Sequence, residues 1–210
     1  MPSQVPPTPA EGDGRFQRSH RTRQLVLDAF LDLLNEGDLA PTSQRIAERS
    51  GVSLRTVFHH FNDMETIHDL AGQRMFQRIA AQTRKVSADG PVGRRIDAFI
   101  DSRIAVNRMM HNVSSAARLR EPFSPVLQRN RDHLVRLGDR EIRTVFSREL
   151  SPLPPAAQDA LVAAIAMVGN WPSWYSLTEE LGVAPAVAEN VLRASVRALL
   201  SSRSAFTRAT

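Results

Sequence analysis

The side chains best suited to contacting another molecule gather in the segment 42–61. If its second half is a helix with about 100° of rotation per residue, Val57 and Phe61 share one side, which a protein core would bury. The polar residues that point away from that side are Arg55, Thr56 and His59. Arginine can form two hydrogen bonds with guanine, and threonine can bond a base edge or contact a thymine methyl group. The pattern predicts a helix that lies in the DNA major groove.

The residues around this helix predict two short helices joined by a tight turn. Thr42 is a candidate N-cap for a helix that ends by Gly51, and Ser53 is a candidate N-cap for the next helix. Gly51 suits the turn because glycine adopts backbone angles that other residues disfavour. After Phe61, Asn62 and Asp63 give the capping signal for a longer helix.

Helical periodicity continues through the rest of the chain, so the sequence predicts an all-α fold. Apolar residues recur at helical spacing over 21–36, with the stripe beginning at Leu25, and again over 96–104, 126–150, 156–177 and 185–200. Pro172 is expected to kink or break the helix 156–177. We predict a flexible tail over 1–18, a DNA-binding domain with a linking helix over 19–85, and a second helical domain over 90–210.

Residues 21 to about 70 resemble the DNA-binding domain of the TetR family of bacterial transcriptional repressors. The matching residues are Ile46-Ala47, Gly51-Val52-Ser53, Thr56-Val57, His60-Phe61, and Asp63 with Glu65. The resemblance implies a three-helix head, a fourth linking helix, and a helical body that dimerises and usually holds an inducer. It implies a dimeric repressor that a small molecule releases from a palindromic operator in double-stranded DNA. An activator, a ligand-independent regulator, and a helical binding or enzyme module without DNA affinity are the alternatives.

The positions that the resemblance and the helix geometry assign to DNA are Thr42, Gln44, Arg45, Ser53, Leu54, Arg55, Thr56, Phe58, His59, His60 and Met64. Phe58 stands where the family commonly has a tyrosine that bonds a phosphate, and Met64 where it often has a lysine. Four arginines before the first helix are expected to compensate as a basic arm on the DNA backbone or minor groove: Arg15, Arg18, Arg21 and Arg23. For two of these positions a purely structural role is an equal alternative to DNA contact. Thr42 can act as a helix cap alone, and His60 can satisfy a buried hydrogen bond.

Large apolar groups in the second domain are candidates for lining the inducer pocket: Phe99, Met109, Met110, Phe123, Trp171, Trp174 and Tyr175. The alternative is that they are ordinary core. The helix 156–177 is apolar on more than one side, through Leu161, Ile165 and Val168 and again through Val162, so it must be buried on both. Pairing it with the last helix across a two-fold axis predicts a four-helix homodimer interface.

Composition and motifs exclude several other classes. The net charge is +5, but residues 1–80 hold nine arginines against ten acidic residues, so bulk charge gives no support for DNA binding. The chain has no cysteine, no apolar stretch long enough for a membrane span, and no secretory signal, which predicts a cytoplasmic protein without a membrane partner. Glu65 and His68 form a single Glu-x-x-His, whereas a di-iron bundle needs two. We therefore expect no catalytic residues, no metal and no cofactor.

Overall fold

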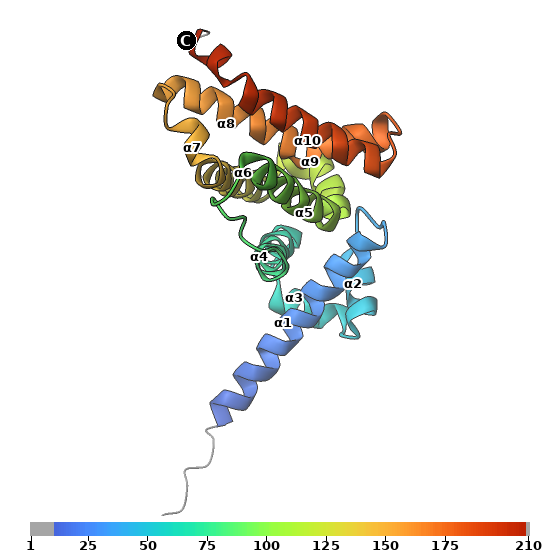
Figure 1. Cartoon of the computed structure of the whole chain (residues 1–210). Helices are drawn as coiled ribbons and strands as arrows, with labels where there is room; N and C mark the ends of the chain where they lie inside the picture. The colour runs from blue at the N-terminus through green and yellow to red at the C-terminus, as the bar shows by residue number, and fades with distance from the viewer. Residues whose placement is uncertain (1–10, 209–210) are drawn as a thin grey trace, which may run out of the picture. The chain divides into compact units, whose positions relative to one another are not determined.

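The computed structural model describes residues 11–208, which form helices and no strand (Figure 1). The chain divides after Arg74 into two compact units, which we call the head (residues 11–74) and the body (residues 75–208). The all-α prediction is confirmed. None of the described helices is both long and apolar enough to cross a lipid bilayer.

The head consists of α1 (Glu11–Asn35), α2 (Ser43–Ser50), α3 (Leu54–His60) and the first part of α4 (Met64–Gln82). Its core is made by apolar side chains from all four helices, which include Val26, Phe30, Leu34, Ile46, Val57, Phe61 and Ile67. Phe30 and His68 meet edge to face with ring centroids 5.0 Å apart, and Arg74 pairs with Asp28 at 2.7 Å. These contacts fix α4 against α1.

Helix α1 begins ten residues earlier than the sequence periodicity predicted. Residues 11–18, which we expected in a flexible tail, are helical; residues 1–10 lie outside the described part of the chain. The segment after Ala10 contains no proline, and acidic residues at a helix start are favoured by the helix dipole. Leu25 was predicted on the buried stripe but is 45% exposed, whereas Leu27 and Leu31 are buried. The stripe is displaced because α1 packs against several helices.

The boundary between the units falls inside α4, not in the loop 85–93 where the sequence placed it. The second half of α4 belongs to the body, where the ring of Phe76 lies 5.0 Å from that of His133 in α6 (Pro125–Val145). The linking helix therefore contributes one half to each unit.

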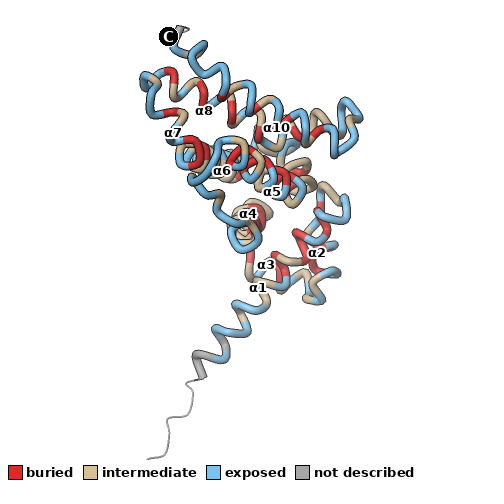
Figure 2. Tube along the Cα trace, in the orientation of Figure 1, coloured by how far each residue is buried: buried red, intermediate tan, exposed pale blue. Residues whose placement is uncertain are grey.

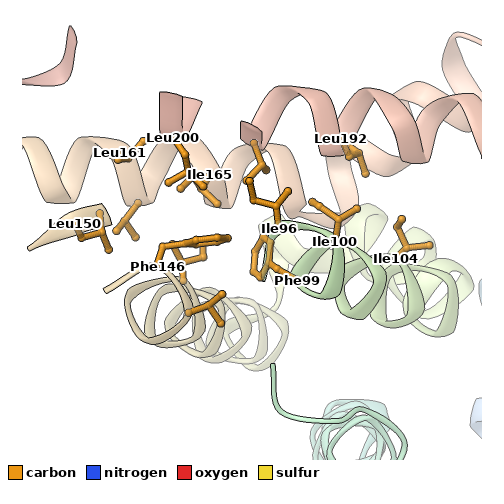
Figure 3. Packing of buried hydrophobic residues seen from close by; sticks show 14 of the residues in the cluster. Ile96, Phe99, Ile100, Ile104, Phe146, Leu150, Leu161, Ile165, Leu192 and Leu200 are labelled. Carbon is orange, nitrogen blue, oxygen red and sulfur yellow. The ribbon is translucent and has the colours of Figure 1, made fainter. Parts of the chain in front are cut away.

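The body contains α5 (Val92–Arg120), η1 (Glu121–Phe123), α6, α7 (Ser147–Leu150), α8 (Pro155–Gly169), α9 (Trp171–Tyr175), the π-helical turn η2 (Ser176–Glu180), α10 (Pro185–Ser201) and η3 (Arg203–Arg208). Figure 2 marks the buried positions along the chain. Most of the buried hydrophobic side chains of the body form one cluster, part of which Figure 3 shows from close by. Phe99 and Phe146 meet edge to face at its centre, with ring centroids 5.4 Å apart.

The predicted kink at Pro172 is a complete break two residues earlier. Helix α8 ends at Gly169, and the Asn170 side chain accepts a hydrogen bond from the Ser173 backbone at 2.9 Å to cap α9. Pro172 lies in the first turn of α9, where its missing N–H costs no helical hydrogen bond. An asparagine N-cap with a proline in the first turn, as at Asn170 and Pro172, is a local sequence signal for the start of a helix.

Candidate nucleic-acid interface

The turn between α2 and α3 has the left-handed geometry that its glycine predicted. Gly51 adopts φ 70° and ψ 18°, and its backbone N–H donates to the Glu48 carbonyl at 3.4 Å. The N–H of Val52 donates to the Ala47 carbonyl at 3.2 Å, and the Ser50 hydroxyl donates to that of Ile46 at 2.7 Å. The last carbonyls of α2 are thus satisfied within the turn, which fixes the direction in which α3 leaves.

Both predicted N-caps are confirmed. The Thr42 hydroxyl accepts a hydrogen bond from the Arg45 backbone at 3.3 Å, and the Ser53 hydroxyl accepts one from the Thr56 backbone at 3.1 Å. The hydroxyls of Ser53 and Thr56 also lie 2.8 Å apart, so they share a hydrogen bond. The Thr56 side chain is therefore held in one position before any ligand arrives.

The two sides of α3 are oriented as the helical spacing predicted. Val57 and Phe61 are each 1% exposed and pack in the head core, whereas Arg55 and His59 are exposed and Thr56 is half-buried. Phe58 is 54% exposed, an unusual position for a phenylalanine. Leu54 is half-buried at the first position of the helix.

The arginines and the glutamine of α2 bind acidic side chains of the head, whereas the arginine of α3 forms no ion pair with a described residue. Arg45 pairs with Asp38 at 3.0 Å, and the Gln44 amide donates to Glu48 at 2.8 Å. Arg49 binds Glu36 with two hydrogen bonds, which lower the pKa of that carboxyl and raise that of the guanidinium. Arg55, by contrast, has no ion-pair partner among the residues that the structure describes.

His60 lies beside the head core and is half-buried. Burial lowers the pKa of its ring, and the nearby positive charges of His59 and Arg23 lower it further. The His59 and His60 rings contact edge to face, with centroids 5.3 Å apart and an interplanar angle of 69°. His60 is therefore a neutral side chain at neutral pH, whereas His59 is exposed beside it.

The start of α4 packs against the start of α2. The Asp63 carboxylate accepts hydrogen bonds from the Thr66 backbone (2.7 Å) and hydroxyl (2.8 Å), which lower its pKa. Met64 is half-buried, and its sulfur accepts a hydrogen bond from the Ser43 hydroxyl at 3.4 Å. Sequence reasoning missed Ser43, because a serine just inside a helix gives no signal of a partner 21 positions away.

No cluster that could hold a metal ion occurs in the described residues, since nowhere do three or more His, Asp or Glu side chains gather. The histidine of the Glu-x-x-His pattern, His68, is buried and packs against Phe30 in the head core.

The predicted pocket-lining residues of the body do not form one surface. Phe99, Met110 and Trp174 are buried, and Phe99 and Trp174 belong to the central core cluster. Phe123 is 89% exposed, so none of the described residues encloses it. Met109, Trp171 and Tyr175 are half-buried.

Trp171 and Tyr175 belong to an aromatic cluster that also includes His111, which the sequence did not single out. The Trp171 and Tyr175 rings are 5.0 Å apart, and His111 stacks on Tyr175 at 6.0 Å. The Arg118 guanidinium lies over Tyr175 at 5.7 Å. The buried Trp171 Nε1 has no hydrogen-bond partner in residues 11–208. Nearby, Asn107 donates to the Gly169 carbonyl at 3.2 Å.

Solved structures share this arrangement of helices. A transcriptional regulator from Rhodococcus sp. Rha1 superposes with a TM-score of 0.69 over 86% of this chain and 96% of its own, at 18% sequence identity. A proposed transcriptional regulator from Pseudomonas aeruginosa PAO1 superposes with a TM-score of 0.66 over 88% and 93%, at 16% identity. The chain has the fold of these regulators. No protein-family model and no curated protein matches its sequence.

Proposed function

We propose that this protein is a DNA-binding transcriptional regulator, and that it acts as a dimeric repressor released from a palindromic operator by a small-molecule inducer. The observation that carries the proposal is the α2–turn–α3 unit. Its turn is fixed by Gly51, its second helix is anchored by Val57 and Phe61, and its outward side carries the unpaired Arg55. A rigid short helix with such a side fits the major groove.

In this proposal Arg55, Thr56 and His59 contact base edges. Arg55 has no ion-pair partner within residues 11–208, so a bidentate contact with guanine breaks no ion pair there. Thr56 keeps its hydroxyl bonded to Ser53, which orients it toward one base. The residues proposed to contact or support the sugar–phosphate backbone are Thr42, Gln44, Arg45, Ser53, Leu54, Phe58, His60 and Met64.

The roles of the supporting residues differ in how directly they can act. Arg45 must leave or share Asp38 to reach a phosphate, so its contribution is smaller than that of a free arginine. Met64 acts through packing, since its sulfur faces Ser43. His60 contributes as a neutral group because its pKa is lowered.

The outer side of α8 and α10 supports the homodimer. A shallow depression of about 320 Å³ lies between them, lined by Ala164, Met167, Val168, Ser195, Ala198, Leu199 and Ser202. Met167 is 64% exposed, and α8 carries no charged residue after Asp159. A helix that is apolar on its outer side needs a second covering surface, which a two-fold copy supplies. The two recognition helices would then bind half-sites about 34–36 Å apart, or a multiple of that.

The inducer is proposed to bind beside the aromatic cluster of His111, Trp171 and Tyr175. Trp171 Nε1 is a buried donor with no hydrogen-bond partner among the described residues, and a ligand acceptor would satisfy it. Because α4 contributes one half to the head and the other to the body, a ligand that shifts body helices can bias the head through one continuous helix.

The decisive experiment for DNA binding is to incubate the purified protein with sheared DNA from its source organism at near-physiological salt, and to sequence what is retained. Enrichment of a short palindrome is expected. If nothing is enriched by the protein as purified or after refolding to strip bound ligand, the proposal is wrong. Transcription of the adjoining genes should rise when the protein is deleted; a fall would indicate an activator.

Replacing Arg55 by alanine tests the contact side of α3. The variant should lose about 1–3 kcal/mol of affinity and relax specificity at one base position. Arg129, an exposed arginine of α6, provides a control that removes the same charge from the body. A loss that is uniform across sequences would make Arg55 a phosphate contact instead.

The dimer is tested by Met167→Glu, which places a carboxylate on the outer side of α8. Sedimentation analysis should show dissociation, because the interface would have to bury an unpaired charge. Val135→Glu on α6 is the matched control, since Val135 is similarly exposed at 61%. Dissociation by both variants, or by neither, would contradict the proposed interface.

A further inference from the structure

The segment 14–24 of α1 is rich in arginine and packs little against the rest of the head. Residues 14–27 contain four arginines and no acidic residue; the nearest carboxylates are Asp13 and Asp28. Arg18, Arg21 and Arg23 are exposed, and Phe16 is 72% exposed. Figures 1 and 2 show this segment of the helix running clear of α2 and α3, with an exposed surface.

These arginines lack carboxylate partners, unlike several arginines of the body. In the body, Arg95, Arg103 and Arg193 each pair with an acidic side chain within 3.0 Å. Arg18 donates only to the Gly14 carbonyl, at 3.1 Å, and neither Arg21 nor Arg23 forms an ion pair with a described residue. Like charges three positions apart repel on a helix, so this arrangement gives the isolated head no stability.

The basic segment lies on the same unit as the α3 contact side. The charge of Arg23 is close enough to His60, at the end of α3, to lower the pKa of that ring. Eleven residues from 14 to 24 extend about 16 Å at 1.5 Å per residue. A polyanion bound along α3 that reached this helix would meet several uncompensated guanidinium groups.

We propose that the segment 14–24 is a second DNA-contact surface, a rigid helix that binds the phosphate backbone flanking the operator half-site. This inference rests on the proposed DNA-binding function. A flexible basic arm could enter the minor groove, as the sequence alone suggested. A helix is too wide for the minor groove of about 6 Å, since its diameter with side chains is about 10–12 Å. Its arginines therefore contact phosphates and carry no base specificity.

The test uses the full chain with Arg18 and Arg21 replaced by alanine. Alanine has the highest helix propensity, so this variant keeps the helix, which circular dichroism verifies. DNA affinity is measured on the selected fragment between 50 and 400 mM salt. Removing two phosphate contacts should reduce the slope of log K against log salt by about 1.8, which corresponds to roughly 30-fold weaker binding near 0.15 M.

Two further variants separate the possible outcomes. Arg129→Ala with Arg136→Ala removes two exposed arginines from α6 and should leave the slope unchanged. Arg18→Lys with Arg21→Lys keeps the charge and should retain most of the affinity, since phosphate binding needs charge more than a planar fork.

If the parent protein binds DNA and the Arg18/Arg21 alanine variant has the parental slope, the second surface does not exist, although the proposed function stands. A variant that weakens binding with no change in slope, or relaxes base specificity, would equally overturn the phosphate contact. If the parent itself shows no salt-dependent DNA binding, the proposed function fails first.

Discussion

The turn residue Gly51 allows the sharpest test of how the head is built, through its replacement by alanine. Its φ of 70° lies in the left-handed region, and a Cβ added there would meet no heavy atom within 4 Å. The cost is therefore the intrinsic one for an L-residue, about 1–2 kcal/mol, offset by about 0.4–1 kcal/mol from the stiffer unfolded chain. We expect a net destabilisation of about 1 kcal/mol, confined to the head.

Hydrogen exchange followed by mass spectrometry is the suitable assay, because both tryptophans lie in the body and fluorescence would not report the head. Peptides that cover α2 and α3 should exchange about 5-fold faster in Gly51→Ala, whereas peptides from α8 and α10 should not change. Gly51→Asn should recover part of the loss, since asparagine enters the left-handed region more readily.

Gly93→Ala is the matched control, because Gly93 lies in the first turn of α5 and also has open space around its Cβ position. A helical backbone favours alanine, so this variant should be neutral or stabilising. If Gly51→Ala is neutral as well, the left-handed turn does not fix the α2–α3 unit, and our reasoning about the recognition helix is refuted.

Two further predictions concern buried charge and pH. Arg95 has a side chain only 4% exposed and donates to Glu149 at 2.8 Å and to the Val145 carbonyl at 2.6 Å, so Arg95→Ala leaves a carboxylate and a carbonyl unpaired. It should cost about 3–5 kcal/mol of unfolding free energy, measured by tryptophan fluorescence in urea; a loss below 1 kcal/mol would show that solvent replaces the pair. The pKa of His60 is lowered in the folded head, so the unfolded state binds more protons between that value and about 6.5. Head stability should therefore fall as pH drops below about 6.5 and level off below the folded pKa, as measured by hydrogen exchange, and His60→Asn should remove that dependence; an unchanged pH profile in the variant would contradict the assignment.

Local rules were sufficient wherever a few neighbouring residues decide the backbone. The caps at Thr42 and Ser53, the left-handed turn at Gly51 and the inward side of α3 were all predictable. Each depends on a hydrogen bond or a steric preference that acts within about four residues. The same rules were available at Asn170 and Pro172, but the apolar pattern that continues across them hid the helix break.

The sequence predicted which side of α3 faces outward, but it did not predict which charged side chains of the candidate site are paired. The sequence could not show that Arg45 is paired with Asp38 while Arg55 has no ion-pair partner in the described part of the chain, or that the Met64 sulfur faces Ser43. These partners depend on how separate helices pack, which one-dimensional spacing does not encode.

By itself the sequence determined an all-α chain, the helix–turn–helix unit and the side of α3 that faces outward, because period, capping and glycine geometry are local properties. Only the tertiary structure decided that α1 begins at Glu11, so that the arginine-rich segment 14–24 is helical, that Leu25 is exposed, and that α4 belongs half to each unit. It alone brought His111 to Trp171 and Tyr175, about 60 positions away. Such contacts follow from the side of each helix that the assembled core can cover, and this depends on all the helices together.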